Sequence, residues 1–249
     1  MATNFKKVCQ FNTVFGVPHF DEKQESIDPK LFKLRVDLCR EELQELKEAF
    51  EQNNLIEVID ALADEAYVIY GLASSFGINL DSEFYKYMIS PRFNKNIKIT
   101  QSNFDKVKLW FEDQGDVFGG KPNINNIEFG FRPHLDQMFA TLQNLEKIDN
   151  WDTYVGHVCC LLFKVYNMAF MCGVELDQAF SIVHESNMSK LCTSEEEAKK
   201  TVEHYKLNDP RYDSPNYRKS ENYWVIFNES TGKILKSINY NAADFSKLI

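Results

Sequence analysis

The sequence predicts an all-α fold, a tandem-duplicated helical bundle (a pseudo-dimer) with a small C-terminal β-hairpin. Three observations support this prediction. Glycine (10) and proline (7) are scarce among the 249 residues, and apolar residues recur with mostly helical spacing. Two segments separated by 96 residues repeat one pattern. Only the tail from residue 223 onward carries β-prone runs.

Helix start and stop signals occur along most of the chain. Pro29 follows a capping aspartate, Asn53 or Asn54 can cap the next helix, and Gly77 can end that helix in a left-handed C-cap. The polar, Asn-rich stretch 91–102 suits a linker. The expected helices are 30–52, 54–76, 81–89, 103–114, 133–147, 151–172, 176–188 and a weaker one at 194–206.

The C-terminal tail differs in character from the rest of the chain. Residues 223–227 and 233–238 are β-prone, and the segment 228–232 between them is rich in turn-forming residues. We expect these two runs to pair as the β-hairpin.

An internal repeat divides the helical part into two similar units. Residues 70–81 and 166–177 share Tyr, Ala, Gly, Leu and Asp at a constant offset of 166 − 70 = 96. Upstream, Phe11 and residues 15–18 are echoed by Phe111 and residues 118–122, with a small insertion. Two amphipathic helices can look alike by chance, but several features matching in one order favour duplication. The expected divisions are a first unit 1–95, a second unit 100–190 and an extension 191–249.

Net charge and cysteine usage limit the classes of partner. The formal charge of −9 argues against nucleic acid or an anionic membrane as a partner, since both bind basic surfaces. A bound metal ion would still let an acidic protein bind a polyphosphate. The six cysteines include no Cys-x-x-Cys pair, so we expect reduced thiols, no zinc site and a cytoplasmic protein.

The first unit carries a set of carboxylates with helical spacing. Glu42 and Glu45 share one face of the helix 30–52, while Glu57, Asp60 and Asp64 share one face of the next helix. The second helix is apolar on most sides, so at least one of its aspartates should point inward. A buried carboxylate is costly unless it is protonated, paired or metal-bound. Two facing acidic helices therefore predict an all-oxygen site suited to Mg²⁺ or Mn²⁺.

The alternative interpretation is that these residues form solvated acidic faces. We prefer that interpretation for Glu41, Glu48 and Glu51, and for Glu57 both interpretations stay open. A di-iron site of the ferritin type would need Glu-x-x-His, which the sequence does not contain.

The second unit lacks this set of carboxylates. At the offset of 96, Asp60 corresponds to Gly156 and Asp64 to Cys160, so this unit should not hold a metal ion. It carries instead the segment 183–191, which includes Asn187 and Lys190. Without further information, these two residues suit a solvated helix end about as well as a ligand site.

These motifs, taken in order, resemble the all-α nucleoside triphosphate pyrophosphohydrolase superfamily of MazG-like and phosphoribosyl-ATP pyrophosphohydrolase-like enzymes. The family pattern is Glu-x-x-Glu on one helix and Glu-x-x-Asp on the next. Glu42-x-x-Glu45 fits the first half, and Asp64 resembles the family aspartate. The preceding family glutamate would fall on Ala61, and either Asp60 or Glu57 can replace it. Segment 186–190 and the tail 223–238 resemble one branch of the family.

The resemblance implies cleavage of a nucleoside or deoxynucleoside triphosphate between the α and β phosphates, giving a nucleoside monophosphate and pyrophosphate. It implies Mg²⁺ (or Mn²⁺) held by carboxylates, a carboxylate acting as general base, and contacts from the second unit to the substrate. No nucleic acid or membrane partner is expected, and the chain would be a monomeric pseudo-dimer or a homodimer. The implied residues are Glu42, Glu45, Asp60 and Asp64 for metal, Glu41 or Glu45 for catalysis, and Asn187 and Lys190 for substrate.

A second class of function stays open at this point. A non-catalytic nucleotide-binding or scaffold protein would keep the fold and lose the chemistry, and Ala61 is consistent with it. Tyr67, Tyr70 and Trp224 could stack on a base, although we expect a core role for each. The base and sugar of the substrate are not indicated by any motif.

Overall fold

Helices form most of the chain. The computed structural model describes residues 2–26, 28–91, 93, 97–119, 121–125, 128–148 and 150–249, without the side chains of 128 and 129. Arg92 and residues 94–96 of the predicted linker lie outside the described residues. Within the described residues the elements are α1 (Asn4–Phe15), α2 (Pro29–Glu51), α3 (Leu55–Ser74), α4 (Leu80–Met88), α5 (Asn103–Asp113), α6 (Glu128–Leu145), α7 (Trp151–Cys172), α8 (Leu176–Met188), α9 (Glu195–Asn208), β1 (Pro215–Ser220) and β2 (Tyr223–Asn228).

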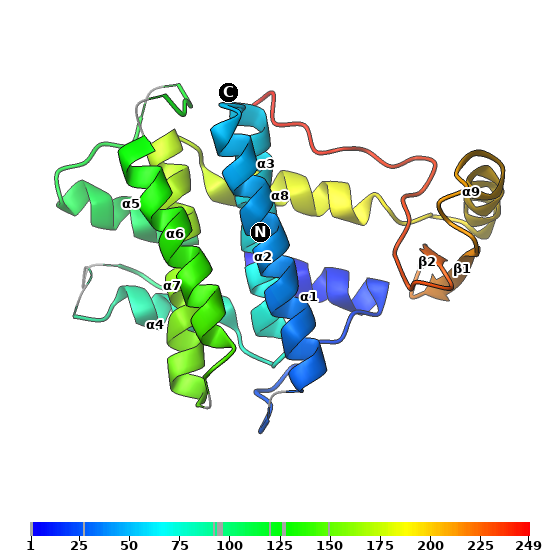
Figure 1. Cartoon of the computed structure of the whole chain (residues 1–249), viewed down its shortest axis with the longest axis horizontal. Coiled ribbons are helices and arrows are strands. Elements are labelled where there is room, and N and C mark those ends of the chain that lie inside the picture. Colours follow the sequence, from blue (N-terminus) through cyan, green and yellow to red (C-terminus); the bar gives the residue numbers. More distant parts are fainter. Residues whose placement is uncertain are drawn as a thin grey trace.

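Four long helices form a closed bundle at the centre of the molecule. The helix α2 packs on α3, α3 on α7, α7 on α6, and α6 back on α2 (Figure 1). The shorter helices cross between the units, since α8 of the second unit packs on α3 of the first, and α4 of the first packs on α7 of the second. One apolar cluster runs through both units, from Val8 to Phe245. The two predicted units therefore share a single core.

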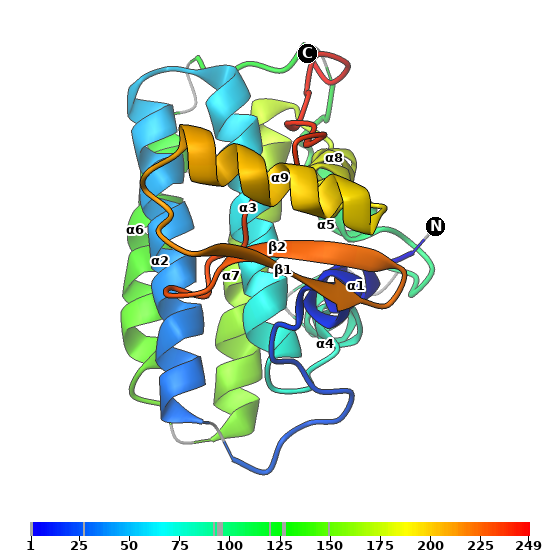
Figure 2. The ribbon, with the colours of Figure 1, turned by 90° about the vertical axis from the view of Figure 1, so that its right-hand side faces the viewer.

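The elements α9, β1 and β2 together form a small body that we call the α9–hairpin unit. It lies at one end of the molecule and has its own apolar cluster (Figure 1). Seen from that end, it lies in front of the long helices, and the C-terminal segment returns from it toward the bundle (Figure 2).

Most of the predicted helices are confirmed. One begins earlier than predicted, and one further helix was not predicted. The helix α1 was not predicted; Thr3 caps its start, and it ends at Gly16, whose φ of +66° is left-handed. The helix α6 begins at Glu128, before the predicted start at Pro133, and contains that proline. Gly77 is left-handed as predicted, with a φ of +70°, but it follows the C-cap Ser75 by two residues. A Cβ at Gly77 would lie 1.7 Å from the carbonyl oxygen of Glu22, so only glycine fits there.

The pairing predicted for the hairpin is wrong. The strand β2 pairs with β1, with Lys219 opposite Trp224, whereas 233–238 contributes only an isolated bridge between Ile234 and Phe227. The residues 228–232 do form a turn, in which the Gly232 N–H donates to the Asn228 carbonyl at 2.7 Å. The strand β1 escaped prediction because its residues are mostly polar and partly exposed, so it lacks the apolar alternation of a half-buried strand.

The helix α7 is long and apolar enough to meet the length and composition criterion for a membrane-spanning helix. About two thirds of its most apolar window is buried within the molecule (67%), which is the pattern of a core helix.

A polar cluster around Asp81 ties the second unit to the first. One oxygen of Asp81 accepts hydrogen bonds from the Tyr70 hydroxyl at 2.7 Å and from Nδ2 of Asn103 at 2.8 Å. Its other oxygen accepts the backbone N–H of Phe5 at 3.2 Å. Since Asn103 opens α5 in the second unit, this cluster joins the two units.

The same cluster recurs around Asp177 with the units exchanged. One oxygen of Asp177 accepts from the Tyr166 hydroxyl at 2.5 Å and from Nδ2 of Asn4 at 2.6 Å, and the other accepts the N–H of Phe104 at 3.0 Å. This reciprocity supports the predicted duplication, whose boundaries stay a prediction. The α1 and α5 residues are related by 103 − 4 = 99, which places Phe11 opposite Trp110 rather than Phe111.

We expect Asp81→Ala and Asp177→Ala to lower the free energy of unfolding by similar amounts, about 2–4 kcal/mol each, because each removes the acceptor of a buried tyrosine hydroxyl and of one N–H of a buried asparagine. Urea unfolding followed by circular dichroism measures both. Asp136→Ala, at an exposed position on α6, should stay within about 0.5 kcal/mol of the unmodified protein. A neutral Asp177→Ala would contradict the reciprocal role of the two clusters.

Candidate functional site

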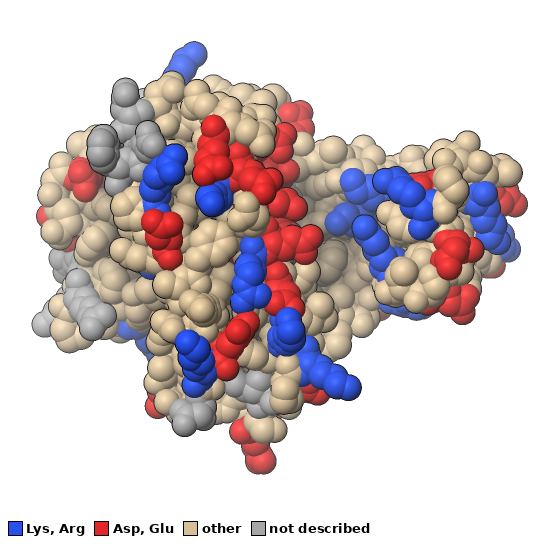
Figure 3. Space-filling view, viewed as in Figure 1, with Lys and Arg blue, Asp and Glu red and all other residues tan. Residues whose placement is uncertain are grey.

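A cleft of about 500 Å³ lies along the α2–α3 pair and contains the predicted carboxylates. Glu42 lines it from α2, and Asp60 and Asp64 line it from α3. The other walls come from α1, the end of α8 and the C-terminal segment between Lys236 and Ala243. Acidic side chains gather on the helical body and basic ones on the facing side of the α9–hairpin unit, with a hollow between them (Figure 3).

The cleft carboxyl groups hold their protons unusually tightly. Burial, and then the charges of Asp64 and Glu45, raise the pKa of Glu42 to about 8. Burial and the neighbouring Asp60 raise the pKa of Asp64 to about 7, and burial with Glu57 also raises the pKa of Asp60. Burial and like charges both penalise the ionised form. A cation placed among these groups would be strongly favoured.

Glu65 belongs to the same acidic region and was missed by the sequence analysis. It is 0% exposed, and neither carboxyl oxygen has a hydrogen-bond partner among the described residues. Burial, together with the charge of Glu42, raises its pKa well above the usual value. Its position in an apolar run beside Asp64 was the available signal, because an acidic residue on the apolar side of a helix is costly.

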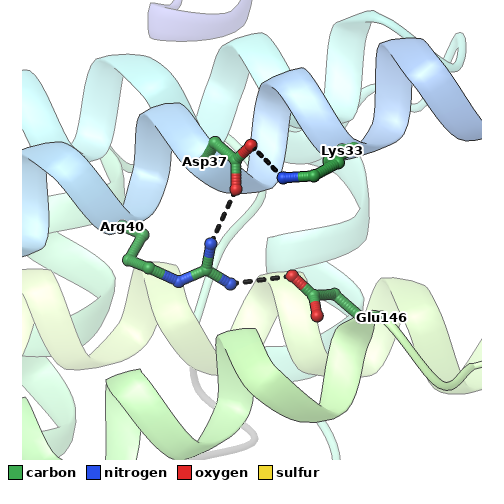
Figure 4. A network of polar contacts seen from close by, with 4 residues as sticks. All are labelled: Lys33, Asp37, Arg40 and Glu146. Atoms are coloured by element: carbon green, nitrogen blue, oxygen red, sulfur yellow. Dashed lines mark hydrogen bonds and ion pairs between the residues drawn. The ribbon is translucent and has the colours of Figure 1, made fainter.

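Arginine and lysine side chains do not neutralise this region by ion pairing. Glu42, Asp60, Asp64 and Glu65 form no ion pair with any described residue. Arg40, adjacent in sequence to the acidic motif, contacts Asp37 on its own helix at 2.7 Å and Glu146, just after the end of α6, at 2.8 Å (Figure 4).

The predicted residues outside the cleft lining lie at its margin. Glu45 and Glu41 are exposed on α2, and the charge of each raises the pKa of Glu42. Glu45 also raises the pKa values of Asp60 and Asp64, so it lies close to all three carboxyl groups. Glu57 is exposed at the start of α3 and acts electrostatically on Asp60.

The predicted substrate residues lie on the opposite wall. Asn187 and Lys190, at the end of α8, line the cleft, and Nζ of Lys190 donates to Oδ1 of Asn187 at 2.6 Å. The pKa of Lys190 is lowered by burial and by Lys236 but raised by Asp64. The structure thus brings together residues that the sequence places in different units.

A second lysine on this wall was not predicted. Lys236 lines the cleft from the C-terminal segment, and its Nζ lies 4.1 Å from the centre of the Tyr240 ring. That segment is fastened to α8, since the Ser186 hydroxyl bonds to Tyr240 at 3.1 Å and the N–H of Asn241 donates to Ser189 at 2.9 Å. Lys236 falls within the β-prone run 233–238, which was predicted to be a strand, and that prediction hid its place in the cleft.

The aromatic residues behave mostly as predicted. Tyr67 is buried at the edge of the cleft, stacks on Phe180 and bonds through its hydroxyl to Nδ1 of His184 at 3.0 Å. Tyr70 is fully buried, and Trp224 packs in the apolar cluster of the α9–hairpin unit.

The donor chemistry of the cleft fits a hard divalent cation, although the carboxylates do not form a ready cage. In the part of the chain that the structure describes, no three His, Cys, Asp or Glu side chains are arranged so that they could hold a metal ion. The carboxyl groups of Glu42, Asp60 and Asp64 are nevertheless half-buried, mutually repelling and without an ion pair to any described residue, which suits Mg²⁺ or Mn²⁺ better than a softer metal. Rotation of the longer Glu42 and Glu45 side chains would be needed to complete coordination.

Comparison with known proteins gives two matches. Residues 8–87 match the phosphoribosyl-ATP pyrophosphohydrolase (PRA-PH) family, a range that contains Glu42, Asp60 and Asp64. The uncharacterized protein L479 of Acanthamoeba polyphaga mimivirus is 36% identical over 259 residues, which cover all of this chain and 96% of the relative. No solved structure matches this chain.

The raised pKa values predict how stability depends on pH. Unfolded carboxyl groups titrate near pH 4, so Glu42 and Asp64 bind more protons in the folded state between about pH 4 and pH 8. These two groups should therefore lower the free energy of unfolding as the pH rises through this window, by at least about 1 kcal/mol, whereas His184, whose pKa burial lowers to about 4, acts in the opposite sense below about pH 6.5. Urea unfolding of metal-free protein at several pH values measures this.

Glu42→Gln should remove much of that slope, because the amide does not titrate. Added Mg²⁺ should restore stability mainly at the high-pH end, where the carboxylates are ionised. Stability that rises from pH 5 to pH 8 in metal-free protein would contradict this description of the cleft.

Proposed function

The chain belongs to the all-α nucleoside triphosphate pyrophosphohydrolase superfamily of MazG-like and PRA-PH-like proteins, and from this premise we propose that it is a Mg²⁺-dependent hydrolase. It would cleave a nucleoside or deoxynucleoside triphosphate between the α and β phosphates. The observation that carries this proposal is the cleft itself, with an acidic wall from α2 and α3 opposite a wall that holds Lys190 and Lys236.

In this proposal the acidic wall is the metal site. Glu42, Glu45, Asp60 and Asp64 would hold Mg²⁺, with Glu57 as the alternative to Asp60 for the family glutamate. The bound ion would neutralise phosphate charge and lower the pKa of a coordinated water molecule. Glu65 stays protonated beneath this wall, since burial without a partner disfavours its ionised form.

A carboxylate at the margin of the cleft would orient the attacking water as general base. Glu45 is the better placed of the two candidates, because its charge acts on Glu42, Asp60 and Asp64, whereas among these Glu41 acts only on Glu42. Both side chains are exposed, so either is free to accept a proton and release it to solvent.

The opposite wall would bind the triphosphate. Lys190 and Lys236 have no carboxylate in ion-pair contact among the described residues, and the pKa of Lys190 is lowered by its burial and by the charge of Lys236. A phosphate between them would relieve this repulsion and accept hydrogen bonds from both. Asn187 orients the Lys190 ammonium group. The second unit thereby completes a site whose metal ligands lie in the first, which gives one site per chain.

A non-catalytic nucleotide-binding protein is the second candidate. The alanine at position 61, where the family has glutamate, favours it. Magnesium-dependent release of pyrophosphate from a panel of nucleoside triphosphates separates the candidates, because a binding protein would retain nucleotide without releasing pyrophosphate.

We expect Asp64→Asn to leave the protein folded and to lower Mg²⁺-dependent pyrophosphate release by at least about 100-fold, since the amide is a poorer ligand for a hard cation. Glu48→Gln, an exposed position on the same acidic stretch of α2, is the matched control and should keep full activity. Unchanged pyrophosphate release by Asp64→Asn would reject its assignment to the metal site.

Lys236→Ala should raise KM for the triphosphate by about tenfold, the effect of losing one charged phosphate contact. Lys233→Ala is the control, because Lys233 is exposed on the same segment and packs over Tyr212, outside the cleft lining. Steady-state kinetics at several salt concentrations would show a weaker salt dependence for Lys236→Ala alone. Equal KM values for the two variants would remove Lys236 from the phosphate wall.

A further inference from the structure

A buried arginine lies at the far end of the cleft from the carboxylates. Arg35 is 8% exposed and lines the cleft from α2, seven residues before Glu42. At about 1.5 Å of rise per residue, the two residues are about 10 Å apart along one helix face. On α3 the same spacing separates Asp64 from Gly71, which also lines the cleft. We call the Arg35–Gly71 region the base end.

Hydrogen bonds fix the Arg35 side chain in place, and some of its N–H donors find no partner in the described part of the chain. Its Nε donates to the Ser75 hydroxyl at 2.7 Å and its Nη2 to the Pro18 carbonyl at 3.3 Å. Its Nη1 has no acceptor, and its charge no carboxylate, among the described residues. Arg40 on the same helix has two carboxylates (Figure 4). A buried guanidinium that cannot lose its proton needs acceptors from elsewhere.

The backbone of Gly71 lies against this guanidinium, and both residues line the cleft. A Cβ added at Gly71 would lie 3.4 Å from Nη1 of Arg35 and would meet no other heavy atom within 4 Å. Glycine is a poor helix former, so its presence at position 71 runs against the helix preference and leaves this part of the cleft without a side chain. Gly71 therefore presents an open surface of bare backbone to the cleft, next to Nη1 of Arg35, which the described residues leave unused.

This combination is confined to the unit that carries the carboxylates. At the offset of 96, Arg35 corresponds to Phe131, which is fully buried, and Gly71 to Asn167, whose side chain bonds to His134. The open surface and the free guanidinium therefore occur together with the acidic wall.

We propose that Arg35 and Gly71 bind the base of the nucleotide and select a 6-oxopurine, guanine or hypoxanthine, over adenine. This rests on the proposed function, which places the triphosphate between the carboxylates and the two lysines. Guanine presents two adjacent acceptors, O6 and N7, which match the paired donors of an arginine. Adenine presents an amino group in place of O6, which would leave an Arg35 donor facing another donor.

The test uses the full chain with Mg²⁺ and measures pyrophosphate release from dGTP, dITP, 7-deaza-dGTP, dATP and dCTP. We expect kcat/KM for dGTP and dITP to exceed that for dATP by at least about tenfold. The 7-deaza analogue lacks only the N7 acceptor and should lose about tenfold relative to dGTP. Parity of dATP with dGTP, or a preference for dCTP, whose O2 and N3 are also adjacent acceptors, would overturn the proposal.

Arg35→Gln tests the residue itself, because a glutamine amide matches N6 and N7 of adenine. The ratio of dGTP to dATP should fall by at least about tenfold, whereas Arg40→Gln, the matched control outside the cleft, should keep it. An equal loss of kcat/KM for every base in Arg35→Gln would mean that Arg35 is only structural. The comparison of dGTP with 7-deaza-dGTP needs no variant, so it stands even if Arg35→Gln fails to fold.

Results that reject the proposed hydrolase differ from results that reject the proposed base selection. Absence of pyrophosphate release from every triphosphate would reject the hydrolase, and calorimetric binding of dGTP and 7-deaza-dGTP would still test the base end. A difference in binding affinity of about tenfold would support the role of Arg35 without catalysis, and equal affinities would reject it. Cleavage of all triphosphates with equal efficiency would keep the hydrolase and reject the base selection.

Discussion

Electrostatic repulsion between carboxyl groups that are close together and shielded from water determines the properties of the whole cleft. Glu42, Asp60, Asp64 and Glu65 lie on two adjacent helices with no cation in ion-pair contact among the described residues. Such burial is tolerated only while protons or a metal ion reduce the repulsion and while a large apolar core supplies the stability. The bundle of α2, α3, α6 and α7 supplies that core, and it leaves the acidic wall facing away from it, toward the lysines.

The crossing of short helices between the units decides what the acidic wall faces. Because α8 packs on α3 rather than on the long helix of its own repeat alone, Lys190 lies close enough to act electrostatically on Asp64. The polar clusters around Asp81 and Asp177 hold the two units in this arrangement, since each cluster joins residues of both units. In the proposed function, recognition of phosphate and of metal would thus come from different parts of the chain, which packing rather than sequence proximity brings together.

Features with a local cause could be predicted from the sequence, and features that depend on distant segments could not. Helical spacing placed Asp60 and Asp64 on one face, and α7 and α8 were predicted to the residue. The strand β1 was missed because a polar strand lacks apolar alternation. Arg35 and Lys236 were missed for another reason: each reaches the cleft only through the tertiary path of α2 or of the returning C-terminal segment, which no local pattern records.

Asn4 of the first unit contacts Asp177 of the second, and Asn103 of the second contacts Asp81 of the first. This reciprocal pairing determines how the contacts between the units respond to dilution. Both contacts close within one polypeptide, so they form at an effective concentration set by the chain and not by the amount of protein present. A contact between separate subunits would be lost as protein became scarce, whereas these contacts persist in a single molecule. Tethering also frees each unit to change alone, and the first unit carries Asp60 and Asp64 where the second has Gly156 and Cys160.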